Sequence, residues 1–232
     1  MSQEAESAAP AVSLAETLRR YELDLPEEQI GRLDRYCRAL WEWNEKLNLT
    51  RHTDYDKFVS RDVIDSLQAA RLLESGATLL DVGSGGGVPG VILAIVRPDV
   101  KVSLCESVRK KADALRAIVE QVQLNVPVFA QRAEDLLQSQ AFDVLIARAV
   151  GPMEKILRWL EGRWDNAGQL LLIKGPKWAE ERGQARHLGL LRHLELRKAA
   201  EYPMPGTHSQ SVILKLWPKE RDEKISRRKK RP

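Results

Sequence analysis

The chain has 232 residues, of which 43% are hydrophobic and 30% charged, and its formal net charge is +4. This length suits one globular domain with a sizeable core. No apolar stretch approaches the roughly 18–20 residues that cross a bilayer, and the start "MSQEAESAAP" lacks the regions of a signal peptide. Two distant cysteines and four scattered histidines exclude a disulfide scaffold and a histidine metal site. We therefore expect a cytoplasmic protein without a metal.

The N-terminal third is predicted to be helical. Residues 1–12 are rich in small and acidic residues and are expected to be disordered. Apolar residues then recur at helical spacing over 26–49 and again over 54–73. Residues 13–75 are therefore predicted to form an N-terminal helical cap.

From Thr78 the pattern changes to strands that alternate with helices. Strands are predicted over 78–82, 100–105, 126–130, 142–147 and 169–173, with helices over 89–96, 108–124, 152–162 and 177–192. After residue 193, two further strands joined by "PGTHS" predict a closing hairpin that adds an antiparallel strand. The fold class is therefore α/β, a doubly wound, mostly parallel sheet over residues 76–218.

The first strand leads into "DVGSGGGVPG", residues 81–90, where four of the fourteen glycines occupy positions 83–87. A glycine-rich turn between a strand and a helix exposes backbone N–H groups and lets a ligand approach closely. In a doubly wound sheet such a turn lies at the ligand-binding edge. Glu106, which follows the second strand, can accept both hydroxyls of an adenosyl ribose.

Two classes of ligand fit this turn. Gly85, Gly87 and Gly90 satisfy the dinucleotide pattern G-x-G-x-x-G, whereas the frame D-x-G-x-G-x-G from Asp81 is expected for S-adenosylmethionine (SAM). The chain has no Tyr-x-x-x-Lys pair of a short-chain dehydrogenase. It also lacks the Asp/Asn-Pro-Pro-aromatic motif of exocyclic-amine methyltransferases and the Pro-Cys nucleophile that attacks a pyrimidine ring carbon. These absences disfavour exocyclic amines and pyrimidine ring carbons as methyl acceptors.

The C-terminal end is strongly basic. Residues 219–232 hold eight Lys and Arg against three acidic residues, so the rest of the chain is nearly neutral. Such a run is expected to be disordered. It is either a solubilising end or an electrostatic arm for a polyanion such as RNA.

Several motifs in this order resemble the RsmG family, also called glucose-inhibited division protein B. The motifs are "NEKLNLT", "DVGSGGGVPG", "ESVRKK", "QRAED", "FDVLIARAV" and "IKG". The resemblance covers residues 28–217. It implies a Rossmann-like class I SAM-dependent methyltransferase fold and methylation of guanine N7 in bacterial small-subunit (16S) ribosomal RNA. The RNA partner is then expected within a small-subunit particle or an assembly intermediate.

The resemblance also implies which residues contact SAM. Together with the glycine frame and the ribose acid, the predicted cofactor-binding residues are Gly83, Gly85, Val88, Glu106, Ala133, Glu134 and Arg148. The chain departs from the family at Asp62, where family members commonly carry histidine after an arginine. This difference puts a role of that position in RNA contact in doubt.

The target atom determines what chemistry the residues must supply. Guanine N7 has a lone pair and no proton, so no general base is expected, and alignment and charge stabilisation carry the reaction. Candidate RNA-side residues are Asn48, Arg61, Lys174 and Lys177. The alternative functions are a noncatalytic RNA-binding or ribosome-assembly factor on a SAM-binding fold and, with less support, an NAD-binding oxidoreductase.

Overall fold

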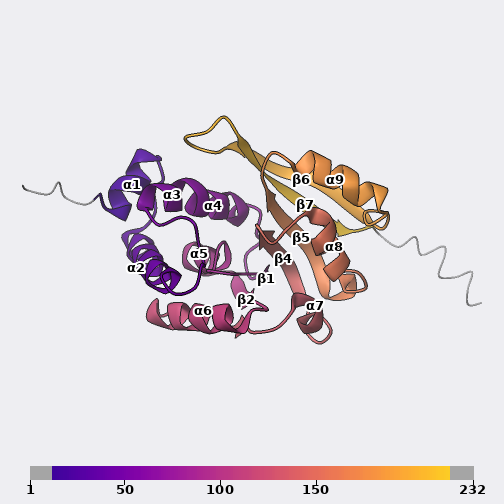
Figure 1. Ribbon diagram of the computed structural model, residues 1–232, viewed down its shortest axis with the longest axis horizontal. Coiled ribbons are helices and arrows are strands. Elements are labelled where there is room, and N and C mark those ends of the chain that lie inside the picture. The colour runs from indigo at the N-terminus through magenta and orange to yellow at the C-terminus, as the bar shows by residue number, and fades with distance from the viewer. Residues whose placement is uncertain (1–11, 220–232) are drawn as a thin grey trace, which may run out of the picture.

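The structure is a computed structural model that describes residues 12–219, and its centre is a seven-stranded sheet (Figure 1). The strand order is β3-β2-β1-β4-β5-β7-β6. The first five strands of this order are parallel, and β7 pairs antiparallel with both β5 and β6. The bounds are Thr78–Val82 (β1), Lys101–Cys105 (β2), Val128–Phe129 (β3), Phe142–Arg148 (β4), Ala167–Lys174 (β5), Leu194–Pro203 (β6) and Gln210–Pro218 (β7).

The predicted α/β class, the parallel sheet and the closing hairpin are confirmed. The strand expected over 126–130 is shorter and pairs only at Val128 and Phe129. Pro127 precedes them and has no N–H to donate to a ladder, although its carbonyl still accepts from Leu104 (2.9 Å). The first strand has the expected bounds, 78–82, and the other strand boundaries differ from the expected ones by at most two residues.

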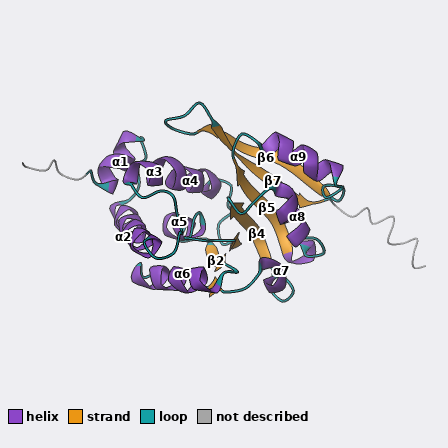
Figure 2. Cartoon of the chain, viewed as in Figure 1, coloured by secondary structure: helices purple, strands orange, loops and turns teal. Residues whose placement is uncertain are grey.

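Nine α-helices lie within the described residues (Figure 2). A π-helical turn, Phe58–Val63, joins α3 to α4. The bounds are Leu14–Arg20 (α1), Glu27–Asn44 (α2), Tyr55–Lys57 (α3), Ile64–Ala70 (α4), Gly90–Val96 (α5), Arg109–Gln121 (α6), Ala133–Leu136 (α7), Met153–Trp159 (α8) and Trp178–His187 (α9). The short helices α1 and α7 were not among the predicted elements.

Five predicted helices end earlier than the sequence pattern indicated, and two of them end five residues early. The helix expected over 26–49 ends at Asn44, because the Asn44 side-chain oxygen accepts the N–H groups of Leu49 (2.7 Å) and Thr50 (2.9 Å). The helix expected over 177–192 ends at His187. Gly189 follows at φ +74°, and Leu190 N–H donates to the Ala185 carbonyl (3.1 Å), which together close the helix.

The sheet is covered on both faces. Alternate strand residues such as Leu79 and Val144 pack with buried residues of α1, α2 and α4 to α6. Their neighbours Leu80 and Leu145 pack with α7, α8 and α9 on the other face. The N-terminal helices therefore share a continuous core with the sheet, and the boundary expected at residue 75 remains a prediction.

The two predicted terminal segments lie outside the described residues, except for Val12 and Lys219. Within residues 12–219, no helix combines the length and apolar character that a membrane span requires.

Candidate functional site

The glycine turn, residues 83–90, connects β1 to α5 at the carboxyl ends of the parallel strands. The N–H groups of Gly83 and Ser84 both donate to the Cys105 carbonyl (2.8 and 3.1 Å), which fixes the turn against the end of β2. Gly83 has φ +70°, and a Cβ there would lie 2.4 Å from Val150 Cγ1. A side chain at Gly83 therefore meets both a strained backbone and a filled space.

Gly85 lies at the open part of the turn. Its φ is +54°, and a Cβ there would meet only the Gly83 carbonyl oxygen, at 3.9 Å. The protein therefore leaves space in front of Gly85, where a ligand can reach the backbone.

Glu106 connects this turn to the end of β2. It is buried, and its Oε2 accepts the Gly85 N–H (3.0 Å) while its Oε1 accepts the Val108 N–H (2.7 Å). Each carboxylate oxygen has lone-pair capacity for a further donor. The predicted ribose acid is thus held next to Gly85 and can still accept hydroxyl groups.

Asp81 lies beneath the turn and is buried, with 1% of its surface exposed. Its Oδ2 accepts the Gly90 N–H (3.0 Å), whereas its Oδ1 is buried without a hydrogen-bond partner among the described residues. Burial raises the pKa of Asp81 from its ordinary value of 3.8 to about 7. A buried carboxylate oxygen without a partner suits a cationic ligand group. Asp81 begins the D-x-G-x-G-x-G frame, but it was not among the predicted cofactor-binding residues.

The remaining predicted cofactor residues lie around the same edge of the sheet. Val88 is half-buried and packs against the core beside the glycine turn. Ala133 is buried at the start of α7, and the carbonyl of Glu134 accepts from Arg163 Nε (2.8 Å). The Glu134 carboxylate lies 3.3 Å from Arg132 Nη1. These contacts fix the backbone after β3 without filling the space near Gly85.

Arg148, at the end of β4, is paired within the chain. Its Nη2 donates to Asp62 Oδ1 (2.5 Å), and its Nη1 donates to Asp65 Oδ2 (3.0 Å) and to the Arg61 carbonyl (3.2 Å). Burial by itself lowers the pKa of Arg148. Asp62 and Asp65 raise this pKa by more than burial lowers it, so the net shift is upward and the guanidinium stays charged. Arg148 thus connects the sheet to the π-helical turn and α4, and its predicted SAM contact remains a prediction.

Asp62, the residue that departs from the family pattern, belongs to this network. Its side chain is fully buried, and its Oδ1 also lies 2.9 Å from His52 Nδ1. Asp65 completes the network by accepting the Tyr202 hydroxyl (2.7 Å). This network was not predicted from the sequence, although a carboxylate in the place of a histidine indicates a changed partner.

The four candidate RNA-side residues are in different environments. Asn48 is exposed in the loop after α2, and the neighbouring Leu49 packs against the glycine turn near Gly86. Arg61 is half-buried, and its Nη1 is buried without a hydrogen-bond partner in the described part of the chain. Lys177 is exposed directly before α9.

Lys174, the fourth candidate RNA-side residue, is largely buried. It is 9% exposed, and its Nζ donates to the Gly151 carbonyl (2.6 Å) and pairs with Glu181 Oε2 (2.8 Å). The ammonium therefore fixes the loop after β4 against α9. An RNA contact by Lys174 remains a prediction that requires this pair to open.

Solved structures share the fold of this chain. The O-methyltransferase from Bacillus cereus in complex with SAH has a TM-score of 0.58 and 17% identity, covering 88% of this chain and 97% of that chain. A mutant of MtNAS in complex with S-adenosylmethionine has a TM-score of 0.55 and 15% identity, covering 88% and 78%. These similarities confirm the predicted class I methyltransferase fold.

Sequence comparisons identify the family. The family model described as GidB, rRNA small subunit methyltransferase G, matches residues 29–203. The ribosomal RNA small subunit methyltransferase G of Rhodopirellula baltica is 50% identical over 187 residues, 81% of either chain. That of Thermotoga petrophila is 34% identical over 219 residues, 93% of this chain and 95% of its own. The chain therefore belongs to the rRNA small subunit methyltransferase G family, as its motifs predicted.

Proposed function

We propose that this chain transfers a methyl group from SAM to N7 of a guanine in bacterial 16S ribosomal RNA. The proposal rests on the open glycine turn, found in a chain that belongs to the rRNA small subunit methyltransferase G family. In that turn the backbone at Gly85 faces open space, its N–H donates to Glu106, and the buried Asp81 lies beneath the turn. A substrate in the small ribosomal subunit also implies that the enzyme acts in the cytoplasm.

The residues of the turn fit the chemical groups of SAM. SAM supplies a methyl group activated on a positively charged sulfur, and it also carries an ammonium group. Asp81 Oδ1, buried without a protein partner, suits a cationic group, and Glu106 suits the ribose hydroxyls. Val88 offers an apolar surface, and the Ala133–Glu134 backbone is available for the adenine edge.

Three carboxylates near this edge of the sheet are already bound to other groups of the chain. Glu106 accepts two backbone N–H groups, and Asp62 and Asp65 are paired with Arg148. A base-free mechanism agrees with this arrangement, because guanine N7 attacks with its own lone pair. The chain then contributes alignment of the two reactants and exclusion of water.

The RNA side of the site is proposed to lie between the loop after α2 and the loop before α9. Asn48 and Lys177 are exposed there, and Arg61 has a guanidinium nitrogen without a partner among the described residues. We also propose that the RNA is presented within a small-subunit particle or an assembly intermediate. No role is assigned to a metal ion.

Methyl transfer from labelled SAM to small-subunit ribosomal RNA tests the proposal. We expect label in the RNA and, after borohydride reduction and aniline cleavage, a primer-extension stop at one guanine. At saturating SAM, the single-turnover rate is expected to be nearly constant from about pH 6.5 to 8.5, since no titrating base is required.

Other outcomes would identify the alternatives. SAM binding without labelled RNA on any small-subunit substrate would indicate a noncatalytic assembly factor. Tight NAD binding without SAM binding would indicate an oxidoreductase. Label on an exocyclic amine would contradict the N7 assignment.

A further inference from the structure

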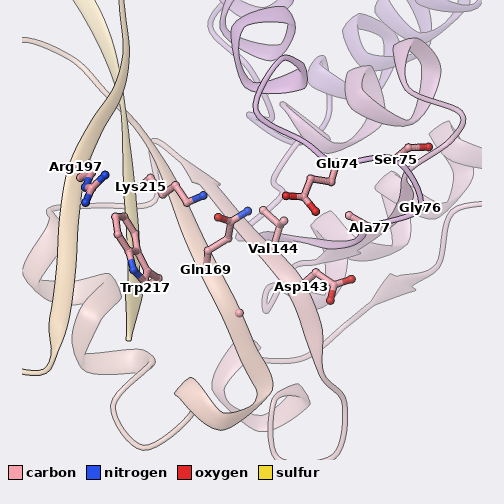
Figure 3. A pocket seen from close by; sticks show the side chains of 11 residues that line it. Glu74, Ser75, Gly76, Ala77, Asp143, Val144, Gln169, Arg197, Lys215 and Trp217 are labelled. Carbon is pink, nitrogen blue, oxygen red and sulfur yellow. The ribbon is translucent and has the colours of Figure 1, made fainter. Parts of the chain in front are cut away.

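Two grooves border the hairpin of β6 and β7, and their charges differ. The larger groove, of about 680 Å³, has Arg197, Lys215 and Trp217 on one side and Glu74 and Asp143 on the other (Figure 3). Both cations lie over the Trp217 ring, 5.4 and 5.6 Å from its centroid. Its positive and negative groups balance, so this groove does not favour a polyanion.

The second groove, which we call the basic groove, has a volume of about 410 Å³ and lies between the end of α9 and the start of β6. Its charged lining is four cations and one acid: Arg182, Arg186, Arg192, Lys219 and Glu195. None of the three arginines forms an ion pair with an acidic residue of the part of the chain that the structure describes. Their charges are therefore available to a ligand.

The positive charge of the chain is concentrated in its C-terminal part, which contains the residues of this groove. From Trp178 to the C-terminus there are 14 Lys and Arg against 7 Asp and Glu, whereas residues 1–177 have 23 against 26. The C-terminal part is therefore +7 and the larger N-terminal part −3. Such a separation of charge is the electrostatic signature of a surface that binds nucleic acid.

The basic C-terminal segment starts at the basic groove. Lys219 N–H donates to the His193 carbonyl (3.0 Å), and Lys219 Nζ donates to the Arg192 carbonyl (3.2 Å). Residues 220–232, which follow directly, contain seven further Lys and Arg against three acidic residues. A basic segment therefore follows in sequence directly after a residue that lines the groove.

The basic groove is remote from the glycine turn. Leu194 pairs with Pro218, and Leu216 pairs with Leu170 near the beginning of β5, so the groove lies at the amino ends of the parallel strands. The glycine turn lies at the carboxyl ends. A strand of eight residues such as β5 spans about 25 Å at about 3.3 Å per residue, which sets the scale of the separation.

We propose that the basic groove binds the phosphate backbone of the substrate RNA at a second contact, apart from the nucleotide that is methylated. Guanidinium groups suit phosphate oxygens because they form paired, charge-assisted hydrogen bonds. The inference rests on the proposed function, since it assigns the RNA of that reaction to this surface.

The test compares two double variants of the full chain that remove the same charge. Arg186→Gln with Arg192→Gln changes two exposed groove residues and leaves Arg182, which lies over the Trp178 ring, in place. The control is Arg19→Gln with Arg35→Gln, two exposed arginines of α1 and α2 that form no ion pair with another residue of 12–219. Binding to small-subunit RNA is measured as a function of salt concentration, together with SAM affinity and methylation kinetics.

We expect the groove variant to reduce the slope of log affinity against log salt by about 1.4–1.8, from 0.7–0.9 for each lost phosphate contact. The KM for RNA rises, whereas kcat and SAM affinity stay at the wild-type values. The control variant keeps the wild-type slope.

An unchanged slope in the groove variant would overturn the proposal, and so would an equal loss in both variants, which indicates general charge only. A chain truncated after Lys219 provides a second measurement. If truncation removes the whole salt dependence, the groove makes no contact. Failure of the wild-type chain to methylate RNA that it binds would instead contradict the proposed function.

Discussion

Glu106 serves both the fold of the turn and the proposed cofactor contact. Replacement by Ala removes the acceptor for the Gly85 and Val108 N–H groups and the expected acceptor for the ribose hydroxyls. A hydrogen bond to a charged group is worth about 1.5–3 kcal/mol, so we expect the Glu106→Ala variant to bind SAM at least about tenfold more weakly. Calorimetric titration measures the affinity.

The matched control for this substitution is Glu120→Ala, which changes an exposed residue of α6. Its SAM affinity is expected to equal that of the wild type. Thermal unfolding separates binding from stability, because the unpaired N–H groups in Glu106→Ala also lower the melting temperature. Wild-type SAM affinity in a folded Glu106→Ala variant would contradict the ribose assignment.

Asp81 introduces a pH dependence into the ligand-free protein. Burial raises its pKa from 3.8 to about 7, so the folded state holds the proton more tightly than the unfolded state. The stability that Asp81 contributes is present at low pH and is lost as the pH rises from about 4 to about 7. We expect the melting temperature of Asp81→Asn to rise relative to that of the wild type as the pH increases over this range, because only the wild type loses this contribution.

The same titration affects cofactor binding in the opposite direction. A cationic ligand group favours the ionised carboxylate, so the wild-type SAM affinity is expected to rise from about pH 6 to pH 8. Asp81→Asn binds more weakly and without this rise. An equal pH dependence in both proteins would show that another group is responsible.

At the scale of elements, the network around Arg148 connects the π-helical turn and α4 to the end of β4. Removal of one partner from a buried ion pair costs about 3–5 kcal/mol. The Asp62→His variant carries the residue common in the family but places a second imidazole beside His52 and Arg148. We expect its free energy of unfolding to fall by about 3 kcal/mol, the lower end, because Asp65 still pairs with Arg148.

Urea unfolding measures this loss. Asp56→His is the control, because Asp56 lies on α3 with 54% of its side chain exposed. We expect the control to change the free energy of unfolding by less than about 1 kcal/mol. If both variants lose the same free energy, the buried network does not connect the helices to the sheet.

The elements also show which features the sequence could predict. Alternating strands and the glycine frame depend on local patterns, and the sheet with its closing hairpin followed those patterns. The pairing of Arg148 with Asp62 joins residues 86 positions apart, and the burial of Lys174 depends on Glu181 of the next helix. Neither has a local signal, because tertiary contacts alone bring these residues together. The early helix ends depend on side-chain and glycine caps that periodicity does not report.

At the scale of the molecule, the sheet separates two functional edges. The glycine turn, Asp81 and Glu106 lie at the carboxyl ends of the parallel strands, and the basic groove lies near their amino ends. Outside the C-terminal part the chain is slightly negative, so it offers little attraction to RNA of arbitrary structure. Contacts at two distant edges therefore favour an RNA whose fold fits both.

This arrangement predicts a preference for folded substrates. Guanine N7 lies in the major groove, which is deep and narrow in A-form RNA, so the target guanine is expected in a loop, in an irregular element or turned out of the stack. We expect small-subunit particles or assembly intermediates to hold such an element in place, and naked RNA to sample other folds.

We therefore expect kcat/KM for methylation to be higher with particles than with deproteinised RNA, with the difference mainly in KM. The measurement uses labelled SAM at saturation with equal concentrations of the two substrates. The groove variant Arg186→Gln with Arg192→Gln is expected to reduce the preference for particles. The reason is that folded RNA places its phosphates at the basic groove, and this variant weakens that contact. Equal kcat/KM on both substrates would mean that recognition is local to the guanine and that the separation of the two edges has no role in substrate choice.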